Sequence, residues 1–407
     1  MTTRSPLAPE TTPSLPDIAG VRLAADGFAL RYKNRPDVLL AVMEEGTTAA
    51  GVFTRSTTRA EPVNWCVESL KHHPRAVLVN AGQANACVGD VARQTIAAST
   101  AAVAEHIGCK PEQVMVASTG VIGQPVNDAK LVDAVNSLAK SESCDYAKAA
   151  EAIRTTDTFA KVATAQADVN GVTVTINGIA KGSGMIAPNM ATMLAFVFTD
   201  AAIEHEALQQ LLQETTDHSF NAITVDGDAS TNDTALAFAT GKAGNAPITH
   251  VHGAEVQAFR DAFLKVMQDL AQQIVRDGEG ATKFITVHVS GAETPEIAKQ
   301  MALDVANSPL VKTAIAGEDA NWGRVVMAVG KAGLPVDMDR LSVAFGEHII
   351  CRAGGLVPGY DETPVAAYMK EAEIDITVEV GDGVGEAIVY TCDLTHAYID
   401  INAHYRS

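Results

Sequence analysis

The chain has 407 residues, of which 47% are hydrophobic and 19% are charged, so we expect a folded protein with a large core and not a disordered chain. Its 49 acidic residues outnumber its 30 basic residues, and the formal net charge is −19. Because an acidic surface repels phosphate backbones and anionic lipids, this charge argues against a nucleic-acid partner and against a membrane surface.

The six cysteines are scattered along the chain and show no pair at the spacing of a zinc site, so we interpret them as free thiols in a reducing compartment. The N-terminal segment lacks a basic stretch followed by an apolar one, and no apolar run reaches the length of about 18 residues that spans a membrane. The sequence therefore predicts a cytoplasmic protein.

The predicted elements begin after a proline-rich arm at residues 1–18, which we expect to be mobile or draped over the surface. An alanine-rich helix is expected at Val91–His106. Apolar runs of strand length predict strands at Val38–Met43, Ala76–Asn80, Val114–Ala117 and Val172–Ile176.

The second half of the chain repeats this mixture of elements. Helical spacing occurs at Ala207–Glu214, Ala254–Val275 and Asn321–Val329, and strands are expected at Ala235–Phe238 and Phe284–Val289. Alternating apolar and polar residues predict a closing sheet meander of Ile374–Val380, Ala387–Thr391 and Tyr398–Ile401. Since helices and strands do not alternate regularly, the predicted fold class is α+β, with layered sheets flanked by helices.

Three glycine- or aspartate-rich segments resemble known ligand loops but lack a required feature. Gly381–Gly385 is followed by a predicted strand where a dinucleotide loop needs a helix, so we expect a tight turn between strands. Asp277–Lys283 lacks the spacing of a phosphate-binding loop. The aspartates 226, 228 and 233 are not followed by the glutamate of a calcium loop, so no metal site is predicted.

The segment Lys181–Phe198 differs from these, because two glycines and a Pro-Asn turn precede Thr192 and then a dense apolar run. This order predicts a constrained loop, with Thr192 opening a fully buried strand. If the Ala191–Thr192 bond broke, the Thr192 hydroxyl would be a nucleophile, and the freed α-amine, with a pKa of about 8, would be its general base. Composition alone favours the alternative that Thr192 merely begins a core strand.

Residues Lys181–Leu194, KGSGMIAPNMATML, resemble the self-cleavage signature of the ornithine acetyltransferases, the bifunctional glutamate N-acetyltransferases of arginine biosynthesis. The resemblance extends over nearly the whole chain. It includes Ala49–Thr54, Asn80–Cys87, Ala117–Gly123, Thr155–Thr158, Asp226–Asp233, Asp277–Lys283, Gly317–Arg324 and Asn402–Ser407.

The resemblance implies a role for each matching residue. Thr192 would be the nucleophile, and cleavage between Ala191 and Thr192 would give chains 1–191 and 192–407, assembled as a heterotetramer with two copies of each. Thr119 and Gly120 would form the oxyanion hole that stabilises the tetrahedral intermediate. The implied substrate-binding residues are Thr155, Lys181, Thr192, Glu279, Asn402 and Ser407.

The implied reaction is a ping-pong transfer of acetyl from N2-acetyl-L-ornithine to L-glutamate through acetyl-Thr192, with no metal or redox cofactor. The sequence leaves open whether acetyl-CoA is a second acetyl donor. The main alternative is a self-cleaving hydrolase or aminopeptidase of related fold, in which water resolves the acyl-enzyme. A pyridoxal-phosphate enzyme with Lys181 as the Schiff-base residue is a further alternative. Two departures from the family pattern are His404 and Ala81-Gly82-Gln83.

Overall fold

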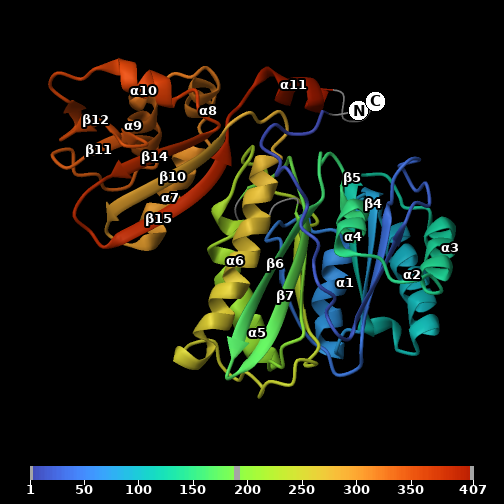
Figure 1. Cartoon of the computed structure of the whole chain (residues 1–407). Coiled ribbons are helices and arrows are strands. Elements are labelled where there is room, and N and C mark those ends of the chain that lie inside the picture. The colour runs from blue at the N-terminus through green and yellow to red at the C-terminus, as the bar shows by residue number, and fades with distance from the viewer. Residues whose placement is uncertain (1–2, 188–192, 404–407) are drawn as a thin grey trace. The chain divides into compact units, whose positions relative to one another are not determined.

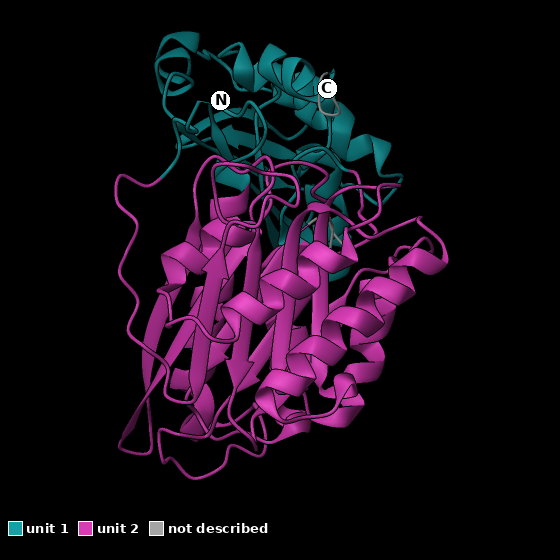
Figure 2. Ribbon diagram, turned by 90° about the vertical axis from the view of Figure 1, so that its right-hand side faces the viewer, with its two compact units in different colours: residues 1–8, 222–227, 275–407 teal, residues 9–221, 228–274 magenta. Residues whose placement is uncertain are grey.

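The computed structural model describes residues 3–187 and 193–403, which divide into two compact units (Figure 2). Unit 1 comprises residues 1–8, 222–227 and 275–407, and unit 2 comprises residues 9–221 and 228–274. Each unit contains its own sheets and core, and each is described by itself below.

Unit 2 contains two sheets. The four-stranded sheet has the order β1-β2-β4-β5, with β1 Val21–Asp26, β2 Val38–Met43, β4 Ala76–Gln83 and β5 Val114–Val121. The five-stranded sheet has the order β3-β9-β8-β7-β6, with β3 Thr48–Phe53, β9 Thr234–Ala239, β8 Leu194–Thr199, β7 Val172–Lys181 and β6 Lys161–Val169. The pairs β4/β5 and β8/β9 are parallel, and the other pairs are antiparallel.

Most helices of unit 2 lie on the outer faces of these two sheets, but the helix Tyr146–Ile153 packs into the core between them (Figure 1). The helices of unit 2 are α1 Glu61–Ser69, α2 Asp90–Ile107, α3 Asp128–Leu138, α4 Tyr146–Ile153, α5 His205–Asp217 and most of α6 Ala254–Arg276, with short 3₁₀ turns at Leu70–His72 and Pro111–Gln113. One core lies between the two sheets, where Leu39 meets Phe196 and Phe238 among others. A second core packs the other face of the four-stranded sheet against α2 and α3.

The apolar runs in the sequence follow from this layering, because a strand buried on both faces has no polar alternation. In β2, Leu39 and Ala41 point into the core between the sheets, while Val38 and Leu40 point toward α2 and α3. Every residue of β8, Leu194–Thr199, is buried, which confirms the prediction of a fully buried strand. The strand begins at Leu194, and Thr192, its predicted first residue, lies outside the described residues.

Unit 1 is built on a six-stranded sheet with the order β13-β12-β11-β14-β10-β15. These strands are β10 Phe284–Ala292, β11 Ser342–Phe345, β12 His348–Arg352, β13 Gly355–Leu356, β14 Glu373–Glu379 and β15 Gly385–Cys392. Its helices are α7 Pro295–Ala306, α8 Pro309–Ala316, α9 Trp322–Lys331, α10 Glu362–Tyr368 and α11 His396–Ala403. One apolar face of the sheet forms the core with α7, α8 and α9.

Two expectations for the C-terminal part are wrong. Tyr398–Ile401 lies in helix α11 and not in a strand, because four alternating residues are too few to separate the two periods. The closing segments do not form a meander either, since β10 lies between β14 and β15 and pairs in parallel with β14. The glycine-rich segment after β14 therefore crosses the end of β10, where a Cβ on Gly383 would lie 1.9 Å from the carbonyl oxygen of Ala292.

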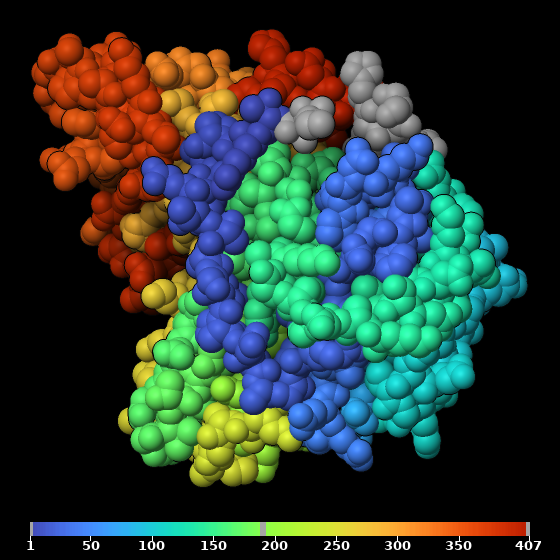
Figure 3. All heavy atoms as spheres, turned by 45° about the vertical axis from the view of Figure 1, so that its right-hand side comes forward, coloured from blue at the N-terminus to red at the C-terminus, as the bar shows by residue number. Residues whose placement is uncertain are grey.

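The other predicted strands and helices are present, and most extend beyond the predicted ends. Within unit 2 the proline-rich arm runs along the surface (Figure 3), where the carbonyl of Pro16 accepts a hydrogen bond from the Asn177 side chain. In the described part of the chain, no helix is both long and apolar enough to cross a membrane.

Candidate active site

The candidate site of unit 2 lies at one end of the five-stranded sheet. Lys181, the last residue of β7, is the register partner of Leu194, the first residue of β8, and Leu194 pairs with Thr234, the first residue of β9. Consequently Lys181, Met193 and Asp233 lie at the same end of three adjacent strands. Ala191 and Thr192, the predicted cleavage site, lie outside the described residues, directly before Met193 in the chain.

Lys181 links this end of the five-stranded sheet to the other sheet. Its side chain is only 2% exposed, and Nζ donates a hydrogen bond of 3.1 Å to Oγ1 of Thr119 in β5. A buried ammonium group is stable only where polar or charged partners replace water. The structure therefore brings together two residues that the sequence predicts for substrate binding and for the oxyanion hole.

Gly120, the second predicted oxyanion residue, lies where β5 touches β4. Its φ is +128°, and a Cβ on this residue would lie 2.3 Å from the carbonyl carbon of Gly82, its register partner. Only glycine fits such an approach without a backbone shift. The side chain of the neighbouring Ser118 donates a 2.6 Å hydrogen bond to Oδ1 of Asn80, which joins the ends of the same two strands.

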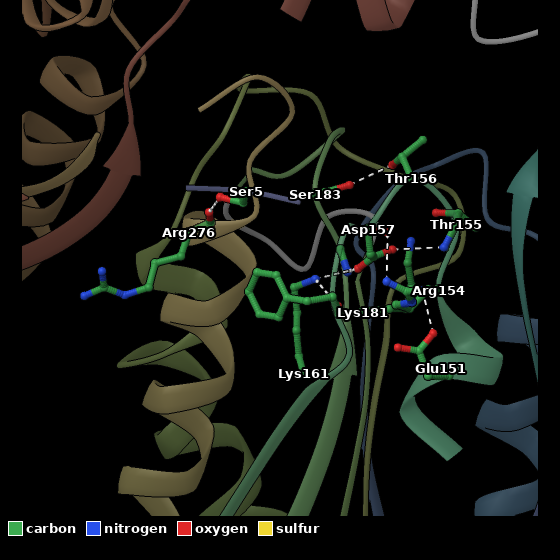
Figure 4. Close-up of polar contacts among 12 residues, drawn as sticks. Ser5, Glu151, Arg154, Thr155, Thr156, Asp157, Lys161, Lys181, Ser183 and Arg276 are labelled. Atoms are coloured by element: carbon green, nitrogen blue, oxygen red, sulfur yellow. Dashed lines mark hydrogen bonds and ion pairs between the residues drawn. The ribbon is translucent and has the colours of Figure 1, made fainter. Parts of the chain in front are cut away.

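Asp157 organises the loop that carries Thr155, another predicted binding residue (Figure 4). Oδ2 accepts a 2.9 Å hydrogen bond from the Thr155 backbone, and Oδ1 accepts 2.6 Å from Gly182 N and 2.8 Å from Lys161 Nζ. One carboxylate thus fixes both the loop and the residue that follows Lys181. Next to it, the hydroxyls of Thr156 and Ser183 are 2.7 Å apart.

The charges around Asp157 keep its carboxyl group ionised. Burial alone would raise the pKa of Asp157, but the ammonium groups of Lys161 and Lys181 and the hydrogen bond from Thr155 N outweigh it and hold the pKa well below the usual range. The side chains of Asp157 and Lys161 are both 0% exposed, so this is a fully buried ion pair. It places a fixed negative charge beside the Lys181 ammonium.

Asp233 is a second buried carboxyl group, and its environment shifts the pKa in the opposite direction. Burial raises its pKa well above the usual value, although the hydrogen bond from Met193 N and the charge of Lys181 oppose that shift. The distance from Met193 N to Oδ1 is 3.1 Å. Two carboxyl groups close to one lysine therefore have pKa values shifted in opposite directions.

Two of the predicted binding residues lie together in unit 1. Nδ2 of Asn402 in α11 donates a 2.7 Å hydrogen bond to Oε2 of Glu279, which is 9% exposed. The turn around Glu279 touches α11 closely, since a Cβ on Gly280, whose φ is +76°, would lie 2.7 Å from Tyr398 N. Thr395 also donates a 2.7 Å hydrogen bond to the Gly280 carbonyl. Ser407, the last predicted binding residue, lies outside the described residues.

Comparison with known proteins gives the family. The sequence model of the ArgJ family matches residues 23–407. The chain is 53% identical over 408 residues to the arginine biosynthesis bifunctional protein ArgJ of Bradyrhizobium diazoefficiens, which covers 99% of each chain. The chain belongs to the ArgJ family.

Other ArgJ proteins are similarly close. The protein of that name from Nitrobacter winogradskyi is 52% identical and covers 99% of each chain. A crystal structure of the ArgJ protein from Bacillus halodurans is 42% identical, covering 50% of this chain and 95% of its own, with a TM-score of 0.48. The resemblance inferred from the signature at Lys181–Leu194 is therefore confirmed by sequence, and the α+β fold class is confirmed by the three sheets and their helices.

Sequence reasoning gave no role to three buried residues of this ArgJ site. Asp157 and Asp233 lie within the motifs that carry the resemblance, as does Asn232, whose Nδ2 donates hydrogen bonds of 2.6 and 2.9 Å to the carbonyls of Ala84 and Ser118. The signal available in the sequence was a polar run, Ser230–Asp233, directly before an apolar strand. Such a run is typical of a solvent-exposed loop, but here all four residues are buried.

Proposed function

We propose that this enzyme transfers the acetyl group of N2-acetyl-L-ornithine to L-glutamate and also acetylates glutamate from acetyl-CoA. Membership of the ArgJ family confirms the predicted enzyme class, an acyltransferase of arginine biosynthesis. The second activity, which the sequence left open, is supported by the relatives of about 50% identity over the full chain, which are named bifunctional. That full-length identity is the observation that carries the proposal.

The proposed chemistry begins with self-cleavage at the Ala191–Thr192 bond. The Thr192 hydroxyl attacks the Ala191 carbonyl, and water then hydrolyses the resulting ester. The freed α-amine takes the proton from Oγ when Thr192 attacks the acetyl carbonyl of acetylornithine, and ornithine leaves with that proton. Glutamate attacks the acetyl ester in turn, and Oγ recovers a proton from its amine.

The oxyanion hole is proposed at the end of β5. Thr119 and Gly120 would present donors to the oxygen of each tetrahedral intermediate, which can contribute several kcal/mol to the rate when the donors are preorganised. The rigidity needed for this is supported by the contact of Gly120 with Gly82 and by the hydrogen bond from Lys181 to Thr119.

The proposed binding residues match the charges of an amino-acid substrate. A cation such as Lys181 suits the substrate carboxylate, and an anion such as Glu279 suits its amine. Thr155, Asn402 and Ser407 would add hydroxyl and amide groups. The Glu279 carboxylate is already positioned by Asn402, which supports a shared role for these two residues.

We further propose chains 1–191 and 192–407, assembled as a cytoplasmic heterotetramer with two copies of each. The hydrogen bonding of the five-stranded sheet supports lasting association of the two chains. In that sheet β7 pairs with β8 and β3 pairs with β9, so the two strands from after position 191 lie between strands from before it. Cutting the connection between β7 and β8 leaves these ladders in place.

A direct test offers the enzyme glutamate with either acetylornithine or acetyl-CoA and follows N-acetylglutamate. Both donors should support its formation, and the Thr192→Ala variant should remain uncleaved and inactive with either donor. Thr192→Ser should keep part of both functions, because it retains a hydroxyl. Release of free acetate at a rate independent of glutamate would establish the hydrolase instead.

A further inference from the structure

The loop between β1 and β2, residues 27–37, contains a basic segment in a strongly acidic protein. From Gly27 to Pro36 it holds three cations, Arg31, Lys33 and Arg35, and no acidic residue, although the whole chain has a formal net charge of −19. A surface of that overall charge repels polyanions, so a polyanionic ligand needs a local group of cations to bind.

The buried Asp37 at the end of this loop fixes its shape. Oδ1 accepts a 2.8 Å hydrogen bond from Phe28 N, and Oδ2 accepts one of 2.7 Å from Leu30 N. The ammonium of Lys130 in α3 donates a 3.2 Å hydrogen bond to the Ala29 carbonyl, which adds a fourth cation beside the loop. The cations are therefore carried on a preorganised backbone, which lowers the entropy lost when a ligand binds.

The same loop touches two parts of the candidate site. Nη2 of Arg35 donates a 3.1 Å hydrogen bond to the carbonyl of Thr155, in the loop that Figure 4 shows. At the other contact, a Cβ on Gly82, the register partner of Gly120, would lie 2.5 Å from the Cβ of Arg31. The basic loop thus lies against the strand ends proposed for the oxyanion hole and against the loop of a proposed binding residue.

Two of the three loop cations keep a charge that the fold does not neutralise. Arg35 has a structural role, since its guanidinium also lies 3.7 Å from the centre of the Tyr32 ring. Arg31 is half-buried, and its Nη1 donates a 3.1 Å hydrogen bond to the uncharged amide oxygen of Gln124, while Lys33 is exposed. Within residues 3–187 and 193–403, no carboxylate forms an ion pair with these three cations.

We propose that Arg31 and Lys33 bind the phosphate groups of acetyl-CoA, an inference that rests on the proposed function. Of the two proposed acetyl donors, acetyl-CoA carries a diphosphate and a 3′-phosphate, and its pantetheine arm separates them from the thioester. Acetylornithine carries no phosphate. Arginine and lysine are the side chains that recognise phosphate, so cations beside the site, apart from the residues proposed to bind the amino acid, suit the distant end of acetyl-CoA. The loop then determines whether the enzyme can use this donor.

The test measures N-acetylglutamate formation with three acetyl donors: acetyl-CoA, acetylornithine and S-acetyl-N-acetylcysteamine, a thioester without phosphates. Lys33→Glu should lower kcat/KM for acetyl-CoA at least about fivefold, mainly through KM, and should leave the other two donors within about twofold. Arg31→Gln should act in the same direction. The matched control is Lys110→Glu, which reverses the charge of an exposed lysine at the opposite end of β5 from Gly120 and should leave all three donors within about twofold.

Salt gives a second readout that needs no variant to fold. Raising the ionic strength from about 0.01 M to about 0.1 M shortens the Debye length from about 30 Å to about 10 Å. The wild-type KM for acetyl-CoA should therefore rise with salt, and Lys33→Glu should flatten that rise. The KM for acetylornithine should depend on salt less strongly.

The inference alone fails if the wild type uses acetyl-CoA and both Lys33→Glu and Arg31→Gln leave its kcat/KM within about twofold. It also fails if the thioester without phosphates loses as much activity as acetyl-CoA, or if Lys110→Glu has the same effect as Lys33→Glu. A wild-type enzyme that uses acetylornithine but neither thioester would refute the acetyl-CoA half of the proposed function and this inference with it. No transfer from any donor would refute the proposed function as a whole.

Discussion

Replacing Asp157 by alanine should destabilise unit 2 strongly, because it breaks a fully buried ion pair. The Lys161 ammonium, 2.8 Å from Oδ1, would be left as a buried charge without this partner, and the backbone N–H groups of Thr155 and Gly182 would lose their acceptor. Breaking a buried pair costs about 3–5 kcal/mol. Each orphaned donor adds roughly 1–3 kcal/mol where water cannot reach it, and these losses overlap because the groups share one network. We therefore expect a loss of at least about 4 kcal/mol.

The assay is urea-induced unfolding at pH 7 of the cleavage-blocked Thr192→Ala chain, so that both proteins are single polypeptides. The chain has two tryptophans, and Trp322→Phe leaves Trp65 in α1 as the fluorescent reporter of unit 2. In a Lys161→Met background the Asp157→Ala loss should shrink by about 2 kcal/mol, since the Lys161 ammonium is no longer there to lose its partner. A loss below about 1 kcal/mol, or the same loss in both backgrounds, would refute the argument.

Three further expectations concern the same end of unit 2. Because the folded pKa of Asp157 is depressed, the stability that this carboxylate contributes is fully present above about pH 4 and is lost as the pH falls further. Below pH 4 the urea midpoint should therefore fall less steeply with pH for Asp157→Asn than for its parent. The folded pKa of Asp233 is raised, so its contribution to stability should decline as the pH rises above about 4. In the cleavage-blocked chain, Asp233→Asn should therefore be more stable relative to its parent at pH 7 than at pH 4. An equal difference in unfolding free energy at the two pH values would show that the pKa is not raised. Gly120→Ala should lower the rate of acetyl transfer by at least about 100-fold, since its Cβ would collide with Gly82. The control is Gly123→Ala, which also has a positive φ but no atom within 4 Å of the added Cβ, and it should retain most activity. Similar losses in both variants would point to backbone strain instead.

The strands of unit 2 could be predicted from the sequence because a strand that is buried on both faces consists of a continuous apolar run. β2 was predicted with its observed ends, and α2 to within one residue at each end. The α11 helix could not be separated from a strand, because its residues in the described range are exposed or half-buried and carry no one-sided apolar pattern. The strand order of unit 1 was missed, since the parallel pairing of β10 with β14 depends on contacts between distant segments.

The candidate site also has features that the sequence predicts and features that depend on the fold. A contiguous signature names Lys181 and Thr192, but the protonation states of Asp157 and Asp233 depend on partners far away in the sequence. Burial raises the pKa of Asp233, whereas the charges of Lys161 and Lys181 outweigh burial and lower the pKa of Asp157. Sequence gives the residue types at these positions, while the environment that sets their chemistry exists only in the fold.

The central claim is that Thr192 carries the acetyl group between two half-reactions. The most direct measurement is the intact mass of the proposed 192–407 chain after brief mixing with acetylornithine alone and rapid acid quenching. The account predicts a gain of one acetyl group on that chain, located at its N-terminal threonine side chain, which disappears when glutamate is added and reappears as N-acetylglutamate. An unmodified chain during steady turnover, or an acetyl group that glutamate does not discharge, would contradict it.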